Sequence, residues 1–360
     1  MSAATLEWLR EDLTEAGRPR SQTETASSLL RLDRLEPWAP LSPRFLRRMG
    51  RTFASLTLSR YPDSESKDLR KSLGKHFRVD PDHILLGKGS DELLEILFLA
   101  VSGPLLLVDP SFPMYRNLAQ LTGRRVLTVP LEKDLSLSID RLLETIRQES
   151  PALVVLSHPN NPTGEALAPE EIERIATTAP GGVLIDEAYA PFAQRSHLSL
   201  LERFPNLMVL RSLSKLGLAA IRLGWLAASP EILSRLDKAR LPFNVDALLQ
   251  SAGTLLCREA LPALEARARR TAARRESLLS ALGRIPGIRP FPSQANFILF
   301  RTASKPSGEV DAGLRSFGIA VRDMSPDHPL LENCLRVTVG EKDELRRFLE
   351  ALSSIMKGPA

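Results

Sequence analysis

The chain has 360 residues, 43% of them hydrophobic and 25% charged, which is typical of a soluble globular protein with one large or two ordinary domains. Its first twenty residues are too polar for a secretory signal, and its most apolar stretch, residues 93–108, is too interrupted to cross a membrane. The formal net charge of +5 comes with arginines spread along the chain, which favours small anionic ligands over nucleic acid. Two cysteines and five scattered histidines predict a reduced, cytoplasmic protein without a metal site.

The predicted elements begin with a short amphipathic helix over residues 6–16, followed by an irregular, proline-containing segment to about residue 40. In the middle of the chain, short runs of branched aliphatic residues end in Pro, Gly, Asp or Ser and alternate with helical patterns such as Pro169–Thr177. This alternation predicts an α/β fold with a mainly parallel sheet. The clearest strand patterns are Leu105–Val108, Ala152–Ser157, Val183–Ile185, Leu207–Leu210 and Leu223–Ala227.

The C-terminal part has a different pattern. Residues 230–285 are nearly all helical, and we expect this stretch to connect two lobes. We therefore predict a large domain over residues 45–265 and a smaller α+β domain formed by residues 1–44 and 266–360. The predicted elements of the C-terminal part of the small domain are Phe297–Phe300, Val310–Phe317, Leu335–Val339 and Glu341–Met356.

Ligands of open α/β sheets bind outside the carboxyl ends of the strands, so polar segments at those ends are candidate binding sites. The loop Gly87–Glu92 (GKGSDE) precedes a predicted helix, whose free backbone N–H groups would bind an anion, although many ordinary helices begin in the same way. The loop His158–Gly164 (HPNNPTG) places two asparagines between prolines. It is either a purely structural turn or a rigid loop that offers a fixed hydrogen bond to a ligand.

Two further segments follow strands. Asp186–Tyr189 (DEAY) presents an acid that either caps a helix or pairs with the pyridinium nitrogen of a cofactor ring. Ser212–Lys215 (SLSK) presents a lysine that either lies in a polar surface turn or forms a Schiff base with an aldehyde cofactor. Arg222 would then add a cation to the cofactor's phosphate. The occurrence of all four segments in this order on one scaffold favours the cofactor interpretation.

These segments resemble those of the pyridoxal phosphate (PLP)-dependent aminotransferases of the aspartate aminotransferase fold, or fold type I, and most of all those of the histidinol-phosphate aminotransferase branch. The resemblance extends from about Leu32 to Phe348. It implies a seven-stranded sheet, PLP as the cofactor and a homodimer. The matching motifs are YPD at 61–63, GKGSDE at 87–92, DPSFPMY at 109–115, HPNNPTG at 158–164, IDEAY at 185–189, SLSK at 212–215, RLGW at 222–225, SQANF at 293–297 and LRVTVG at 335–340.

The resemblance implies a role for each matching residue. Lys215 would carry PLP and transfer the proton at the substrate's α-carbon. Asp186 would pair with the pyridine nitrogen, and Asn161 and Tyr189 would bind the ring oxygen, while Tyr115 would stack on the ring. The residues expected to hold the cofactor's phosphate are Ser90, Asp91, Ser212, Ser214, Arg222 and, from the partner subunit, Tyr61.

On the substrate side, Arg336 would bind a carboxylate or phosphate, with Arg322 assisting. The chain departs from the family pattern in three places. Arg222 follows Lys215 by seven residues, one fewer than is usual. Lys88 stands where a small or amide residue is usual, and we expect it to contact solvent or the substrate. Residues 34–37 replace an Asn-Glu-Asn-Pro-like element near the N-terminus.

The implied reaction is the transfer of an amino group between L-histidinol phosphate and 2-oxoglutarate, a step of histidine biosynthesis. The alternatives on the same fold are an aminotransferase for aromatic or other amino acids and a decarboxylase that acts on threonine phosphate. A PLP-binding regulator or a cofactor-free binding protein is disfavoured, because no helix-turn-helix pattern precedes the fold and the catalytic unit accounts for the length.

Overall fold

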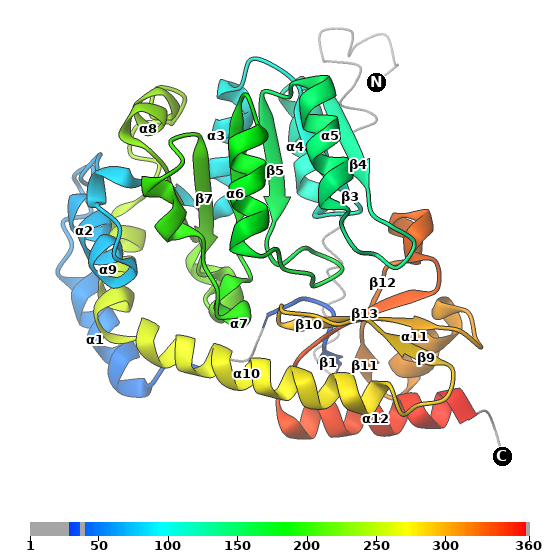
Figure 1. Ribbon diagram of the computed structural model, residues 1–360. Helices are drawn as coiled ribbons and strands as arrows, with labels where there is room; N and C mark the ends of the chain where they lie inside the picture. Colours follow the sequence, from blue (N-terminus) through cyan, green and yellow to red (C-terminus); the bar gives the residue numbers. More distant parts are fainter. Residues whose placement is uncertain (1–28, 37–39, 358–360) are drawn as a thin grey trace, which may run out of the picture.

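The computed structural model describes residues 29–36 and 40–357, so the helix expected over residues 6–16 lies outside the described residues. A seven-stranded sheet forms the centre of the larger unit (Figure 1). Its strand order is β2-β8-β7-β6-β5-β3-β4, and β8 runs in the direction opposite to the other six strands of this sheet. The predicted α/β fold with a mainly parallel, seven-stranded sheet is therefore confirmed. The strands are β2 (Ile84–Lys88), β3 (Leu105–Asp109), β4 (Val126–Pro130), β5 (Leu153–Ser157), β6 (Gly182–Asp186), β7 (Leu207–Ser212) and β8 (Leu223–Ala227).

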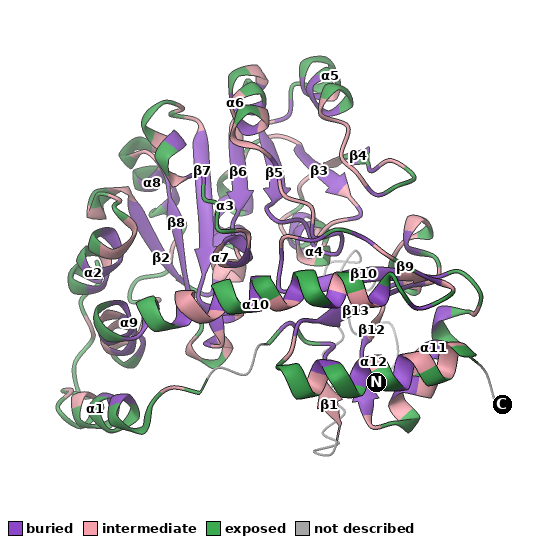
Figure 2. Cartoon of the chain, turned by 60° about the horizontal axis from the view of Figure 1, so that its bottom comes forward, coloured by how far each residue is buried: buried purple, intermediate pink, exposed green. Residues whose placement is uncertain are grey.

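Helices cover both faces of this sheet, and most of its strands are buried, which Figure 2 marks in purple; the edge strand β4 is mostly half-buried or exposed. Side chains alternate between the faces along each strand. In β3, Leu105 and Leu107 share a core with α3, α4 and α8, whereas Leu106 and Val108 share a second core with α5 and α6. The inner strands are mostly apolar because both faces are covered. These helices are α3 (Ser90–Ala100), α4 (Pro113–Leu121), α5 (Ile139–Glu149), α6 (Pro169–Thr178) and α8 (Pro230–Leu236).

The smaller unit is built on a four-stranded antiparallel sheet with the order β12-β13-β10-β9. Its core contains buried residues such as Phe300 and Phe348. Near the N-terminus, β1 (Leu30–Arg31) pairs in parallel with β11 (Ile319–Ala320), so the start of the described chain packs on the C-terminal part. The other elements are β9 (Ile288–Pro290), β10 (Phe297–Thr302), α11 (Ser307–Ser316), β12 (Arg322–Asp323), β13 (Cys334–Thr338) and α12 (Lys342–Lys357).

One long helix, α10 (Leu261–Leu282), joins the two units and runs beneath both (Figure 1). Leu264 lies in a core of the larger unit and Leu278 in the core of the smaller one. The predicted domain boundary at residue 265 falls inside this helix, and the division of the chain stays a prediction. No helix in residues 29–36 and 40–357 is long and apolar enough to cross a membrane. The remaining larger helices are α1 (Pro43–Ala54), α2 (Lys67–Phe77) and α9 (Ala247–Glu259).

Candidate active site

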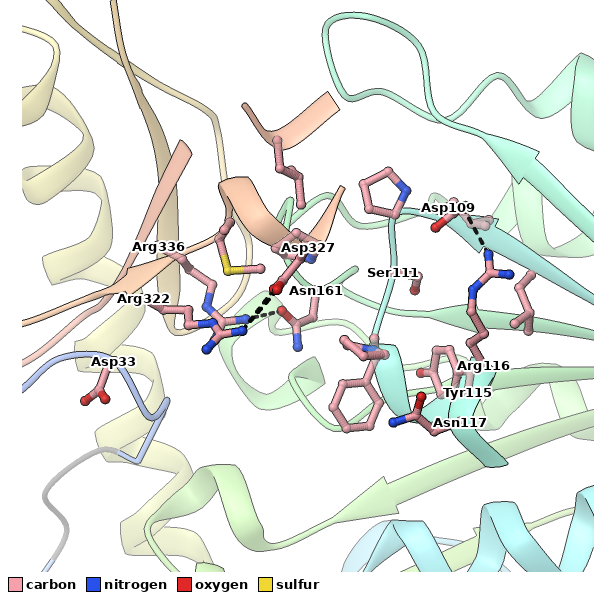
Figure 3. Close-up of a pocket in the computed structure, with 18 of the residues that line it drawn as sticks. Asp33, Asp109, Ser111, Tyr115, Arg116, Asn117, Asn161, Arg322, Asp327 and Arg336 are labelled. Carbon is pink, nitrogen blue, oxygen red and sulfur yellow. Dashed lines mark hydrogen bonds and ion pairs between the residues drawn. The ribbon is translucent and has the colours of Figure 1, made fainter. Parts of the chain in front are cut away.

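The carboxyl ends of the central strands meet at one edge of the large sheet, opposite the small sheet. A cleft of about 520 Å³ lies between them, and Figure 3 shows side chains from both units reaching into it. Tyr115 and Asn161 line it from the large unit, and Arg322 and Arg336 line it from the small unit. Tyr115 and Asn161 thus lie at the place where an open α/β sheet binds its ligands.

Asp186 ends β6 and is buried. One carboxylate oxygen accepts a hydrogen bond from the Tyr115 hydroxyl at 2.8 Å, and the other accepts one from the backbone N–H of Ala188 at 3.0 Å. Burial raises the pKa of Asp186 to about 6, because a charged carboxylate is costly away from water. At neutral pH this acid is ionised and lacks much solvation, so a cationic N–H group is the ligand that it suits best.

The two adjacent asparagines of the HPNNPTG loop have different surroundings. Asn160 is bound to the scaffold, since it accepts from the Ser111 hydroxyl at 2.8 Å and donates to the Thr163 hydroxyl at 3.1 Å. Asn161 lines the cleft, donates to the Tyr189 hydroxyl at 3.4 Å and accepts a hydrogen bond from Arg336. The structure therefore brings Asn161, Tyr189 and Arg336 into one hydrogen-bonded chain across the two units.

The GKGSDE loop packs against the segment that contains Arg222. Arg222 Nη2 lies 3.3 Å from Asp91 Oδ2, and a Cβ added to Gly89 would lie 2.7 Å from Arg222 Nη2. A Cβ on Gly224 would lie 2.6 Å from the backbone nitrogen of Ser90, so this approach requires glycine. Two short 3₁₀ turns, at 214–216 and 219–221, precede Arg222. The shortened loop thus still brings Arg222 to the start of α3.

Ser212 and Ser214 stand next to this loop. The Ser212 hydroxyl donates to the Ser214 hydroxyl at 2.9 Å, and Ser212 is the strand partner of Gly224, which touches Ser90. Hydroxyl groups, a guanidinium and the N-terminus of the eleven-residue helix α3 therefore surround one small region. This is a set of donors suited to a phosphate group.

Lys215 is partly buried just beyond β7, and its Nζ lies 5.9 Å from the centre of the Tyr189 ring. Burial and the nearby charge of Arg336 lower the pKa of Lys215. Both effects disfavour the ammonium form. The position shifts the equilibrium toward the neutral amine, which is the form that attacks a carbonyl carbon and accepts a proton.

Two of the singled-out residues lie away from these contacts. Lys88 forms an ion pair with Asp246, with 3.2 Å between Nζ and Oδ2, and its side chain is half-exposed. Tyr61 is 81% exposed and stacks on Phe243 with 4.6 Å between ring centres. Neither belongs to the group around Lys215.

Sequence reasoning did not single out Glu187, although it follows Asp186. Glu187 is buried and accepts hydrogen bonds from Arg211 at 2.6 Å and from the ring of His197 at 3.1 Å. Although burial opposes ionisation, the hydrogen bond from His197 and the charge of Arg211 lower the pKa of Glu187 to about 2. The sequence did contain a signal for this residue. Side chains alternate between the two faces along a strand, so Glu187, directly after the last residue of β6, is expected to point away from Asp186.

Comparison with known proteins agrees with this geometry. The family model of aminotransferase class I and II matches residues 35–352. The histidinol-phosphate aminotransferase 2 of Nitrosococcus oceani is 36% identical over 97% of each chain, and the histidinol-phosphate aminotransferase of Chromobacterium violaceum is 39% identical over 91% of this chain and 92% of its own.

Solved structures show the same fold. The histidinol-phosphate aminotransferase from Clostridium acetobutylicum superposes with a TM-score of 0.85 at 21% identity, covering 92% of this chain and 100% of its own. The enzyme of the same name from Sinorhizobium meliloti, solved in complex with pyridoxal-5'-phosphate, gives a TM-score of 0.80 at 25% identity over 92% of this chain and 91% of its own. The chain belongs to the aminotransferase class I and II family.

Proposed function

We propose that this chain is a histidinol-phosphate aminotransferase, which uses PLP to transfer an amino group between L-histidinol phosphate and 2-oxoglutarate in histidine biosynthesis. Relatives that match more than nine-tenths of the chain carry this name. The observation that carries the proposal is that Asp186 is hydrogen-bonded to Tyr115, which lines the cleft, and that Lys215 lies close enough to Asp186, Asp91 and Arg336 to feel their charges.

The residues present fit PLP. Asp186 would hold the pyridine nitrogen, whose positive charge would compensate this buried acid. Asn161 and Tyr189 would hold the ring oxygen, and Tyr115, beside Asp186, would lie against the ring. When bound, PLP supplies an electron sink for negative charge that develops at the substrate's α-carbon. Residues proposed to hold the phosphate are Ser90, Asp91, Ser212, Ser214 and Arg222.

Two side chains would act on the substrate itself. Arg336 is partly buried and would bind the anionic group, which orients the α-carbon toward Lys215. Lys215 would take the proton from the α-carbon and later return one, a role that needs the neutral amine that burial favours. The amino donor leaves as a carbonyl compound before the oxo acid enters, so we expect ping-pong kinetics.

We also propose a cytoplasmic homodimer. Tyr61 and two exposed leucines, Leu58 and Leu241, lie on adjoining surface segments, and their exposed fractions are 81%, 73% and 74%. A second subunit over this surface would bury the apolar side chains and would bring Tyr61 to the partner's cofactor phosphate. Cys257 and Cys334 are free and buried, as expected in a reducing compartment.

A substrate panel tests the function. With 2-oxoglutarate as acceptor, we expect kcat/KM for histidinol phosphate to exceed that for phenylalanine by about a hundredfold. Faster turnover of phenylalanine would identify an aromatic aminotransferase instead. Release of CO₂ from threonine phosphate without any oxo acid would identify a decarboxylase, an activity named for a structural neighbour from Porphyromonas gingivalis with a TM-score of 0.78.

A further inference from the structure

Two arginines stand opposite each other in the wall of the cleft that the small sheet forms. Arg322 on β12 and Arg336 on β13 are direct partners across the two strands, and both line the cleft. Figure 3 shows their guanidinium groups beside Asn161 and Asp327. Like charges directly opposite in a sheet repel each other, so such a pair needs an anion nearby.

The two arginines are compensated differently. Arg322 Nη2 lies 3.1 Å and 3.2 Å from the two carboxylate oxygens of Asp327. Arg336 is bound instead to the neutral amide oxygen of Asn161 and lies over the Phe297 ring. Its Nε is buried and has no hydrogen-bond partner within the described residues. The structure thus contains one neutralised guanidinium and one whose charge is directed at the cleft.

The other charged groups of the cleft leave this difference intact. Asp33 is bound by Arg31 at 2.6 Å, and Asp109 is bound by Arg116 at 3.1 Å. Arg34 and Glu36 add one charge of each sign. The net charge at the anion-binding end of the cleft therefore depends on the three side chains Arg322, Arg336 and Asp327.

We propose that Asp327 is a specificity-determining residue that limits how strongly this cleft prefers a phosphate dianion to a carboxylate. With Asp327 ionised, the two arginines present about one net positive charge, which suits a site that must accept both the phosphate of the donor and the carboxylate of the oxo acid. Without the Asp327 carboxylate they present two, which would favour the phosphate dianion further. The inference rests on the proposed function, because it assumes that the substrate's anionic group binds at Arg336 and Arg322.

Coulomb's law gives the size of the effect as a ratio. The repulsion energy between Asp327 and a bound anion is proportional to the anion's charge, so it is twice as large for a dianion as for a monoanion. When Asp327 is neutralised, the factor by which kcat/KM rises for a dianion is therefore the square of the factor for a monoanion. We expect Asp327→Asn to raise kcat/KM about threefold for a monoanionic donor and about tenfold for a dianionic one. A residue that only held Arg322 in place would lower both values together.

L-histidine and L-histidinol phosphate form a matched pair of donors, since they share the imidazole and the amine and differ in the anionic group. The half-reaction of the PLP-loaded full chain with each donor, followed by cofactor absorbance, gives the two values of kcat/KM. In Asp327→Asn the ratio of histidinol phosphate to histidine should rise about threefold at pH 8. The rise should disappear below about pH 6, where a phosphate monoester loses its second charge.

Two control variants isolate the charge of Asp327. Asp327→Glu keeps the carboxylate and should keep the wild-type ratio. Asp311→Asn removes another acid of the small unit, one that pairs with Arg315 at 2.8 Å on α11, and should also leave the ratio unchanged. An unchanged or lowered ratio in Asp327→Asn would overturn the role of Asp327 and leave the proposed function standing. Failure of the unaltered enzyme to use histidinol phosphate would overturn both.

Discussion

The two walls of the cleft are built differently. The wall from the large sheet places its polar groups beyond the ends of buried strands of five or six residues, and Asp186 and Asn161 are both buried there. The wall from the small unit places Arg322 on a two-residue strand and Asp327 in a short 3₁₀ turn, with both side chains about a quarter to a third exposed. Rigid elements hold catalytic groups most accurately, and loops adapt more easily. We infer that the large-sheet wall serves the reaction and the small-unit wall selects the substrate.

The largest effect is expected from Lys215→Ala on the large-sheet wall. Loss of the amine removes proton transfer at the α-carbon, so kcat should fall at least about a thousandfold for every donor. Single-turnover measurement with histidinol phosphate and with histidine checks this. Lys88→Ala is the control, because its amine pairs with Asp246 and lies away from Lys215. Substantial transamination by Lys215→Ala would contradict the division between the walls.

Glu187→Gln tests whether the buried network of Glu187, Arg211 and His197 stabilises the large-sheet wall. The change leaves the buried Arg211 without its counter-charge, and we expect a loss of about 3–5 kcal/mol in the free energy of unfolding at pH 7. Denaturant titration followed by circular dichroism measures it. A loss below about 0.5 kcal/mol, the usual range for surface substitutions, would show that this network does not stabilise the site.

The pH dependence of Glu187 gives a second readout. Its pKa is lowered from 4.5 to about 2 in the folded protein, so the ionised form stabilises the fold fully above pH 4.5. This stability is lost as the pH falls toward 2, and it amounts to about 3 kcal/mol. The Gln variant should lack this component of acid sensitivity between pH 5 and pH 2. Equal acid sensitivity of both proteins would contradict the assignment.

On the small-unit wall, Arg336→Gln should raise KM for anionic donors and lower kcat/KM by about a hundredfold, because a charged hydrogen-bonding group is lost from a desolvated site. PLP binding should change little, which separates this wall from the other. Arg289→Gln is a matched control, since Arg289 is exposed on β9 of the same sheet. Equal losses in both variants, or loss of PLP from Arg336→Gln, would refute the distinction.

The smallest effect is expected from Arg222→Lys. Lysine keeps the charge but loses the planar fork that contacts Asp91, so PLP should dissociate about tenfold more readily. The ratio of kcat/KM for histidinol phosphate to that for histidine should stay unchanged. Equilibrium dialysis of PLP and the paired half-reactions provide the two measurements. A change in the ratio with normal PLP binding would place Arg222 on the substrate side.

Three polar motifs of the large-sheet wall, HPNNPTG, DEAY and SLSK, could be predicted because each follows a strand with a clear apolar pattern. The sequence pattern did not reveal the two edge strands, β2 and β4. The residues of β4 are mostly only half-buried or exposed. Asp327 could not be predicted, because residues 325–331 show no periodicity and its partner depends on the pairing of two short strands. A fold that depends on burial leaves a strong sequence signal, whereas a single charge in a loop leaves none.

The most direct test of the account is to locate the lysine that carries the cofactor. The purified PLP-bound protein is reduced with borohydride, digested, and its peptides are sequenced by mass spectrometry. We predict a pyridoxyl label on Lys215 alone, at the end of β7 beside Ser212 and Ser214. A label on Lys88 or another lysine, or no label on a protein that binds PLP, would contradict the central claim.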